Sequence, residues 1–243
     1  MIVIGVDTAA RVGGVAAVDG GRLLGLSVLG KEEAHSEYLL PSLEALLGRL
    51  GLAVKDAGLI AVSIGPGSFT GLRIGLAAVK GMAYAHGIPV VGVSTLLATA
   101  WTYAGTNAVI CSSLDARRES VFAAVYEGTE LGAVRRPVLP EAREEVEEVA
   151  ARLFEHLRNG RDVVLVGDGS AALEAALASR TGREGVAGRV VRAPMDGEPQ
   201  RPANIAHLGA IEFKEGRRED LVELVPNYLR LSEAERRWKQ MQS

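Results

Sequence analysis

Glycine and hydroxyl side chains gather in one run, Gly65–Gly75, whose spacing could bind an anion. The apolar stretch Leu59–Ile64 before it predicts a buried strand, and the Gly-Pro-Gly that follows ends this strand. Ser68 or Thr70 can then cap a helix that continues to about His86. A helix that starts directly after a glycine turn offers free backbone N–H groups and a positive dipole end to an anion. The run is neither a Walker loop nor a GxGxxG motif.

The same helix carries a stripe of small residues, Gly67, Gly71, Gly75 and Ala78. A glycine inside a helix costs about 1 kcal/mol relative to alanine, so a close contact should offset that cost. Either the helix packs tightly on its own sheet, or it docks against a second subunit. The second alternative predicts that Gly71→Leu or Gly75→Leu abolishes dimerisation and leaves the fold intact. Arg73 is either solvated or placed to meet a carboxylate or phosphate.

Two aspartates, Asp7 and Asp115, end similar predicted strands in the two halves of the chain. When Ile2–Asp7 is set over Ile110–Asp115, the later segments Ser63–Ser68 and Leu165–Ser170 also match, in the same order and at a nearly equal offset. Two matches in order predict an internal duplication. We expect two lobes, residues 1–105 and 106–243, with the C-terminal helix in the second.

Each half shows a three-stranded meander followed by alternating helices and strands. In the second half we expect helices over Glu141–Leu157 and Ala203–Lys214 and a short strand at Val190-Val191. This order resembles the ribonuclease-H-like unit of the actin, heat-shock ATPase and sugar-kinase superfamily. The resemblance implies an α/β, actin-like fold in which each lobe is a mixed five-stranded sheet with flanking helices.

In that superfamily a nucleotide lies between the lobes, beside acidic residues at the ends of the first strands. Asp7, with Thr8 beside it, and Asp115 hold those positions here, so they are the candidate nucleotide-binding residues. The alternative for each aspartate is a turn or cap at a strand end. Arg117-Arg118 follows on a turn, either to meet a phosphate in the cleft or as a surface pair.

The composition is that of an ordinary globular protein, with 243 residues, 48% hydrophobic and 23% charged. The formal net charge of −3 predicts no strong global attraction to nucleic acid or membrane. Cys111 lies in an apolar run and is expected to be a buried thiol, as fits a reducing, cytoplasmic location. We find no signal peptide and no apolar run long enough to span a membrane.

Several motifs together resemble the bacterial TsaB (YeaZ) family along nearly the whole chain: Gly65–Gly75, Asp7-Thr8, His35–Glu37, Leu114–Arg117 and Tyr228–Arg230. The resemblance implies a required, non-catalytic partner of TsaD, which transfers a threonylcarbamoyl group to adenosine beside the anticodon of ANN-decoding tRNAs. It further implies that the two subunits recruit the ATPase TsaE, that the chain forms a homodimer when alone, and that it meets tRNA within the complex. ATP or ADP, held weakly or at the TsaD boundary, is the one candidate cofactor.

In this family the first-lobe helices form the dimer interface, and they correspond here to His35–Leu50 and Thr70–His86. The interface residues that we expect are His35, Tyr38, Leu39, Ser68, Phe69, Thr70, Gly71, Arg73, Gly75 and Ala78.

Catalytic and metal-binding residues are not expected. TsaD-type proteins carry a metal-binding His-x-x-x-His, but here Leu39 follows His35 at the fourth position, and a metal site needs three or four ligands. The spacing supports no Ser-His-Asp set. The competing hypothesis is a stand-alone, nucleotide-dependent kinase or ATPase of the actin-like superfamily.

Overall fold

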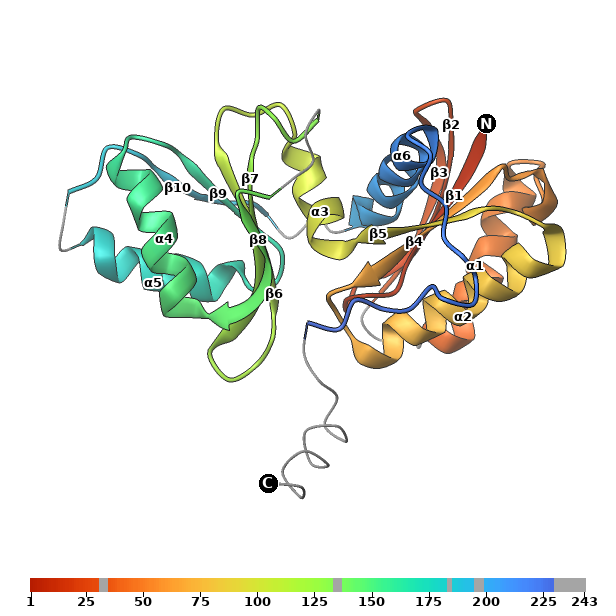
Figure 1. Cartoon of the computed structure of the whole chain (residues 1–243), viewed down its shortest axis with the longest axis horizontal. Coiled ribbons are helices and arrows are strands. Elements are labelled where there is room, and N and C mark those ends of the chain that lie inside the picture. The colour runs from red at the N-terminus through yellow and green to blue at the C-terminus, as the bar shows by residue number, and fades with distance from the viewer. Residues whose placement is uncertain (31–34, 133–136, 183–184, 195–198, 230–243) are drawn as a thin grey trace, which may run out of the picture.

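The computed structural model describes residues 1–30, 35–132, 137–182, 185–194 and 199–229 and contains two lobes, each built on a five-stranded sheet (Figure 1). The first-lobe elements are β1 (Ile2–Asp7), β2 (Gly13–Asp19), β3 (Arg22–Leu29), α1 (His35–Arg49), η1 (Val54–Asp56), β4 (Leu59–Gly65), α2 (Phe69–His86) and β5 (Val90–Ser94). The elements that follow are α3 (Thr95–Ala100), η2 (Trp101–Tyr103), β6 (Val109–Asp115), β7 (Ser120–Glu127), β8 (Leu139–Glu145), α4 (Val146–Arg158), β9 (Val163–Val166), α5 (Ser170–Thr181), β10 (Val190–Arg192) and α6 (Arg201–Lys214).

The two sheets share one topology. Their strand orders are β3-β2-β1-β4-β5 and, in the reverse direction, β10-β9-β6-β7-β8. In each sheet the first strand pairs antiparallel with the second and parallel with the fourth, and Val3 faces Leu59 as Val109 faces Val163. The predicted actin-like fold with two mixed five-stranded sheets is therefore confirmed.

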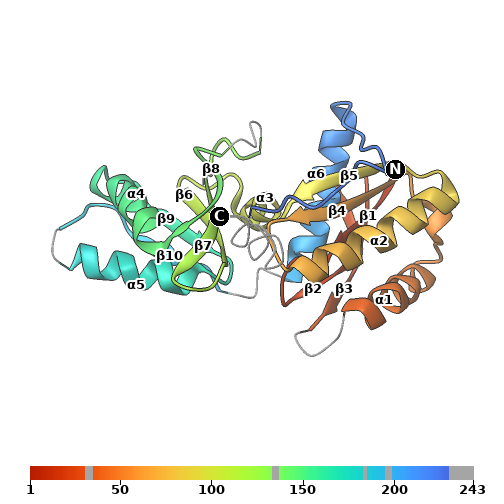
Figure 2. The ribbon, with the colours of Figure 1, turned by 60° about the horizontal axis from the view of Figure 1, so that its bottom comes forward.

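Strands β1, β2 and β4 of the first sheet are buried on both faces because they are apolar at nearly every position. In β1, Ile4 and Val6 point to the face covered by α1 and α2, whereas Val3 points to the face covered by α6. Figure 2 shows these helices on opposite sides of the sheet. The carboxyl ends of β1 and β4 therefore lie at one edge between the helix layers.

One predicted element of the second lobe is wrong at its start. Residues 139–145 form strand β8, which pairs antiparallel with β7, and helix α4 begins at Val146 instead of Glu141. The run of glutamates concealed this boundary, since Glu144 and Glu145 lie in the strand while Glu147 and Glu148 lie in the first helical turn. The positive end of the helix dipole stabilises the charges of Glu147 and Glu148.

Helix α6 follows the second lobe in sequence but packs against β1, β2 and β4 of the first sheet. The backbones approach closely here: a Cβ on Gly5 would lie 2.0 Å from the carbonyl oxygen of Pro202, and one on Gly209 would lie 2.4 Å from the Ala61 Cβ. Thus the predicted second domain, 106–243, includes a helix that completes the first lobe.

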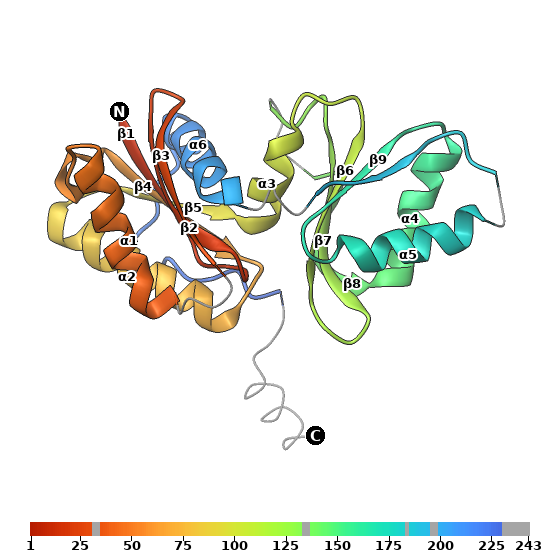
Figure 3. The ribbon, with the colours of Figure 1, turned by 180° about the vertical axis from the view of Figure 1, so that it is seen from behind.

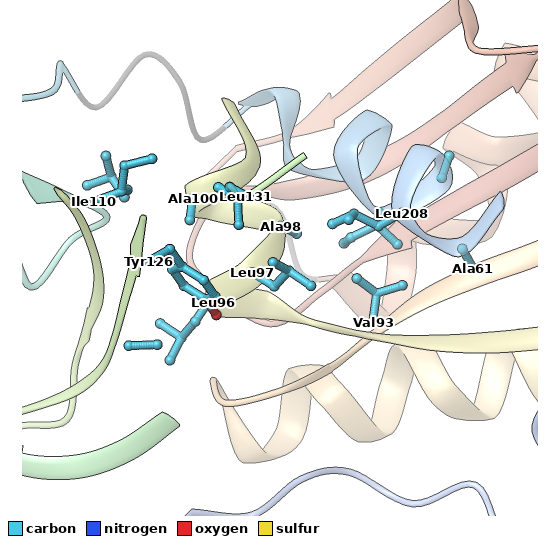
Figure 4. Close-up of a cluster of buried hydrophobic side chains, with 14 of the residues drawn as sticks. Ala61, Val93, Leu96, Leu97, Ala98, Ala100, Ile110, Tyr126, Leu131 and Leu208 are labelled. Atoms are coloured by element: carbon cyan, nitrogen blue, oxygen red, sulfur yellow. The ribbon is translucent and has the colours of Figure 1, made fainter. Parts of the chain in front are cut away.

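Helix α3 joins the lobes and is buried along its whole length (Figure 3). Its leucines and alanines share one hydrophobic core with residues of both lobes, among them Val93 and Leu208 on one side and Ile110 and Tyr126 on the other (Figure 4). The lobes therefore meet through a continuous apolar core. Among the described residues, no helix is long and apolar enough to cross a membrane.

Candidate functional site

The glycine turn between β4 and α2 is bonded to its own lobe. The N–H of Ser68 donates to the carbonyl oxygen of Ala9 at 2.6 Å, and the N–H of Gly71 donates to Ser68 Oγ at 3.2 Å. Ser68 is therefore the cap of α2, and the predicted strand, turn and helix are confirmed. Two N–H groups that could have met an anion are already used inside the lobe.

The small-residue stripe on α2 packs against the loop that follows β1. A Cβ on Gly71 would lie 2.1 Å from the carbonyl oxygen of Thr8, one on Gly75 would lie 2.3 Å from Thr8 Oγ1, and one on Gly67 would lie 2.3 Å from the Ala9 oxygen. Gly71 and Gly75 are buried. The structure favours the first alternative, tight packing within the lobe, since the backbone that approaches these glycines belongs to this chain, and their contact with a second subunit stays a prediction.

Leu39 is excluded from the predicted interface, because it is 2% exposed and belongs to the core under α1. Ala78 is half-buried against the same core. The exposed members of the predicted set are Tyr38, Ser68, Phe69, Thr70 and Arg73. The His35 side chain lies outside the described part of the structure.

Arg73 forms a stacked cluster with two aromatic rings. Its guanidinium carbon lies 3.9 Å from the centre of the Phe69 ring, and its Nε donates to the Tyr228 hydroxyl at 3.0 Å. The Phe69 and Tyr228 rings stack with their centres 5.0 Å apart. Cation–π and ring stacking contacts of this kind hold exposed side chains in a fixed arrangement. The cluster lies at the start of α2 and stays accessible to solvent.

The segment 217–229 runs beside α2 and carries Tyr228 to this cluster (Figure 1). The N–H of Asn227 donates to the Ile64 oxygen at 2.7 Å, and Lys80 Nζ donates to the Val222 oxygen at 3.4 Å. Apolar side chains near it are strongly exposed, with Tyr84 at 85% and Val222 at 86%. Together, the exposed face of α2 and this segment form an accessible surface that combines apolar and cationic groups, which we call the α2 face.

Asp7 does not face an open cleft. The residue is 0% exposed, its Oδ1 accepts the N–H of Ala9 at 3.0 Å, and its Oδ2 accepts Nε of the buried Arg201 at 2.6 Å. Mg²⁺ in nucleotide sites is held through one or two carboxylates, but both oxygens of Asp7 are already bonded. The structure therefore favours a structural role for Asp7 over the predicted nucleotide contact, since its carboxylate, as bonded here, does not fit a magnesium ion.

Thr8 is likewise structural. It is fully buried, and its hydroxyl donates to the Gly71 carbonyl oxygen at 2.7 Å. Its N–H donates to Ser63 Oγ at 3.4 Å. The side chain therefore ties the loop after β1 to α2, and this favours a structural role over the predicted cofactor contact.

On the second lobe, Asp115 lies exposed at the end of β6 beside Asp168. The Asp115 N–H donates to Asp168 Oδ1 at 2.7 Å, while Asp115 Oδ1 accepts the Arg117 N–H at 2.8 Å. Burial raises the pKa of the Asp168 carboxyl, and repulsion from Asp115 adds to this, against the hydrogen bond from the Asp115 N–H and the charges of Arg201 and Arg11. Asp115 is exposed, and its contact with a nucleotide stays a prediction.

A polar cluster joins the lobes at the end of β5. Ser94 Oγ accepts the Leu97 N–H at 3.1 Å, as the cap of α3, and donates to Glu141 of β8. Tyr126 also hydrogen-bonds to Glu141. Burial raises the pKa of the Glu141 carboxyl, against the lowering effect of its two hydrogen bonds. This carboxyl is therefore shared by an edge strand of each sheet.

The described residues contain no group of three His, Cys, Asp or Glu side chains that could hold a metal ion. Cys111 is buried, as predicted, and burial raises the pKa of its thiol to about 12. A thiol in such surroundings is a weak nucleophile.

A protein-family model described as TsaD, tRNA N6-adenosine threonylcarbamoyltransferase, matches residues 31–238. The chain belongs to this family.

Relatives of this chain include TsaB proteins. The tRNA threonylcarbamoyladenosine biosynthesis protein TsaB of Bacillus subtilis is 28% identical over 100% of both chains. That of Escherichia coli is 34% identical over 54% of this chain and 58% of its own length. YeaZ from Pseudomonas aeruginosa shares the fold with a TM-score of 0.70 at 24% identity, over 93% of this chain and 99% of its own. The resemblance to the TsaB (YeaZ) family is confirmed.

The sequence analysis did not identify three residues that contact the candidate site residues. Arg201 starts α6 and carries no local signal of its contact with Asp7. Asp168 lies in the second-half counterpart of the glycine turn, so the duplication could have placed it next to Asp115. Tyr228 belongs to a motif of the resemblance but was not assigned to the interface.

Proposed function

We propose that this chain is a non-catalytic subunit in the formation of N6-threonylcarbamoyladenosine next to the anticodon of ANN-decoding tRNAs. It binds and stabilises TsaD through α1 and the α2 face, helps to recruit TsaE, and forms a homodimer through the same face when alone. It meets tRNA within the complex, in the cytoplasm. The family match supports a role in tRNA threonylcarbamoyladenosine formation, and the exposed apolar and cationic groups support the α2 face as the binding surface.

The observation that carries the proposal is the α2 face. Tyr84, Val222 and the stacked cluster of Phe69, Arg73 and Tyr228 expose aromatic, aliphatic and guanidinium groups on one side of α2. Aromatic residues and arginine are enriched at protein interfaces, where they carry much of the binding energy. A related subunit of the same fold is the partner that we propose for this face.

Two further observations support a role without catalysis. Leu39, at the position where TsaD-type proteins have the second histidine of the motif, is packed in the core under α1. Asp7 is engaged by Arg201, so this carboxylate is not available to a magnesium nucleotide. The alternative, a stand-alone kinase or ATPase, would need that carboxylate, and ATP or ADP at the TsaD boundary would be held mainly by TsaD.

Reconstitution tests the proposal. TsaD, TsaE, threonylcarbamoyl-AMP and a tRNA substrate are combined with or without this chain, and the modified nucleoside is quantified. We expect the rate to fall to background when the chain is omitted and to return when it is added. An unchanged rate without the chain would contradict the proposal. Calorimetry of the isolated chain with MgATP distinguishes this proposal from a stand-alone kinase or ATPase, because such an enzyme requires tight binding and turnover.

A further inference from the structure

Two arginines of the second lobe, Arg117 and Arg118, differ from the other arginines around them. Both are exposed, and within the described part of the chain neither side chain forms a hydrogen bond or ion pair. The other arginines described between residues 109 and 192 each contact a carboxylate or a hydroxyl: Arg143, Arg152, Arg158, Arg161, Arg180, Arg189 and Arg192. Among the arginines described in this range, only the two at this turn therefore have side chains without a polar partner.

The turn that carries these arginines has an unusual backbone. Arg117, Arg118 and Glu119 have φ angles of 63°, 55° and 57°, in the left-handed region that side chains other than glycine rarely adopt. Surrounding bonds hold this conformation: the Arg117 N–H donates to Asp115 Oδ1 at 2.8 Å, and the Val146 N–H donates to the Glu119 oxygen at 3.0 Å. Strain that neighbours fix in this way is commonly found at binding sites.

A third exposed arginine comes from the first lobe. Arg11, on the loop between β1 and β2, is exposed and forms no hydrogen bond or ion pair with another described residue. Its charge acts on Asp168, whose carboxylate accepts the N–H of Asp115 at 2.7 Å. The loops after β1 and β6, which correspond in the duplication, thus both carry exposed arginines near the Asp115–Asp168 pair.

We propose that Arg117 and Arg118, with Arg11 of the first lobe, form a binding site for the phosphodiester backbone of RNA. This site rests on the proposed function, since a subunit of a tRNA-modifying complex must lie close to RNA. Guanidinium groups bind phosphate oxygens strongly and in pairs. Because the whole chain has a formal net charge of −3, attraction to RNA has to come from a local group of cations.

The backbone of RNA fits the site better than the phosphates of a magnesium nucleotide. Asp7, the first-lobe carboxylate that such a nucleotide would need, is bonded to Arg201 and buried. The arginines lie on exposed turns, where a polyanion can cross from one lobe to the other. Small-molecule sites, in contrast, enclose most of their ligand.

Fluorescence anisotropy with a labelled tRNA transcript tests this site, at KCl concentrations from about 50 to about 200 mM. The titration uses the isolated chain and, separately, its complex with TsaD. We expect Arg117→Ala with Arg118→Ala to weaken RNA binding about tenfold, and to lower the slope of log affinity against log salt by about two. The control, Arg158→Ala with Arg189→Ala, removes the same charge from surface positions of the same lobe and should change neither quantity.

Equal binding by the wild type and the Arg117/Arg118 variant would overturn the RNA site. So would a variant that loses MgATP binding in calorimetry while it retains RNA binding, because the arginines would then serve a nucleotide. Complex formation with TsaD is measured by size-exclusion chromatography in the same samples. If the wild-type chain failed to bind TsaD, the proposed function would be contradicted. The titration of the isolated chain with RNA would still decide the RNA site.

Discussion

Arg201 donates from Nε to Asp7 Oδ2 at 2.6 Å, although the two residues lie 194 positions apart in the chain. Both are buried, with exposed side-chain fractions of 1% and 0%. Arg201 also donates from Nη2 to the Val12 oxygen at 2.6 Å, so it fixes both ends of the loop after β1. The ion pair anchors α6 to the first sheet and engages the carboxylate that the fold would otherwise present to the cleft.

We expect Asp7→Asn to lower the free energy of unfolding by about 3–5 kcal/mol, because it leaves the Arg201 charge buried without its partner. Urea denaturation followed by circular dichroism measures this change. Asp7→Asn combined with Arg201→Met, which removes both charges, should recover a large part of the loss. The control Asp162→Asn breaks an ion pair at the surface and should have little effect. Equal stabilities of Asp7→Asn and Asp162→Asn would contradict the structural role.

Two glycines of α2 should respond in opposite directions to alanine. Gly75→Ala places a methyl group 2.3 Å from Thr8 Oγ1, so we expect a loss of about 1–3 kcal/mol from overpacking. Gly81→Ala meets no atom within 4 Å and should stabilise the protein by about 0.5–1 kcal/mol, since alanine favours the helix. Thermal unfolding of both variants measures the difference. Leucine is larger than alanine, so we expect Gly75→Leu to disrupt the fold itself. The sequence alone predicts instead that this variant loses dimerisation and keeps its fold.

Part of the fold could be predicted from the sequence alone. The strand, turn and helix around Ser68 followed from local rules for glycine, proline and capping residues. The duplication followed from two matched segments with aspartates at the strand ends. The small-residue stripe, however, predicted close backbone approach without telling which backbone, and Thr8 of the same lobe proved to be the neighbour.

Long-range partners and strand boundaries were less accessible. No local pattern connects Arg201 with Asp7, because that contact depends on α6 returning to the first sheet. The sequence predicts a helix where β8 lies, because the glutamates of β8 continue into α4 and hide the alternation of apolar and polar residues in the strand. The stacked cluster around Arg73 could not be foreseen either, since Tyr228 reaches it from the opposite end of the chain.

The polar cluster between the lobes predicts a pH effect at Glu141. Burial raises the pKa of this carboxyl in the folded protein above its ordinary value of 4.5. The folded state therefore holds the proton more tightly than the unfolded state, and the contribution of Glu141 to stability falls as the pH rises from about 4.5 through the raised pKa. We expect Glu141→Gln, which keeps a hydrogen-bonding group without a charge, to remove this fall.

The measurement is the difference in free energy of unfolding between Glu141→Gln and the wild type, at about pH 4.5 and about pH 7.5. Ser94 does not titrate, and burial raises the pKa of Tyr126 well above its usual value, so neither neighbour changes charge in this range. The contribution of Asp168 is common to both proteins and cancels. The variant should gain stability relative to the wild type at the higher pH; a difference independent of pH would contradict the prediction.

The α2 face predicts a specific loss of TsaD binding. Phe69→Ala with Tyr228→Ala removes both rings that stack with Arg73, so we expect affinity for TsaD to fall at least tenfold, by about 1.4 kcal/mol or more. Surface plasmon resonance measures the affinity, and circular dichroism checks that the fold is unchanged. Val191→Ala, which trims an exposed apolar side chain on β10 of the second lobe, is the control and should bind normally. A similar loss in both variants would argue against this surface.

Amide hydrogen exchange of the chain, with and without TsaD, tests most directly whether the α2 face is the working surface. The account predicts that TsaD slows exchange in α1, α2 and residues 217–229, and leaves the strands of the second lobe unchanged. Protection confined to the loops after β1 and β6, with none on α2, would show that TsaD engages the cleft and would contradict the account.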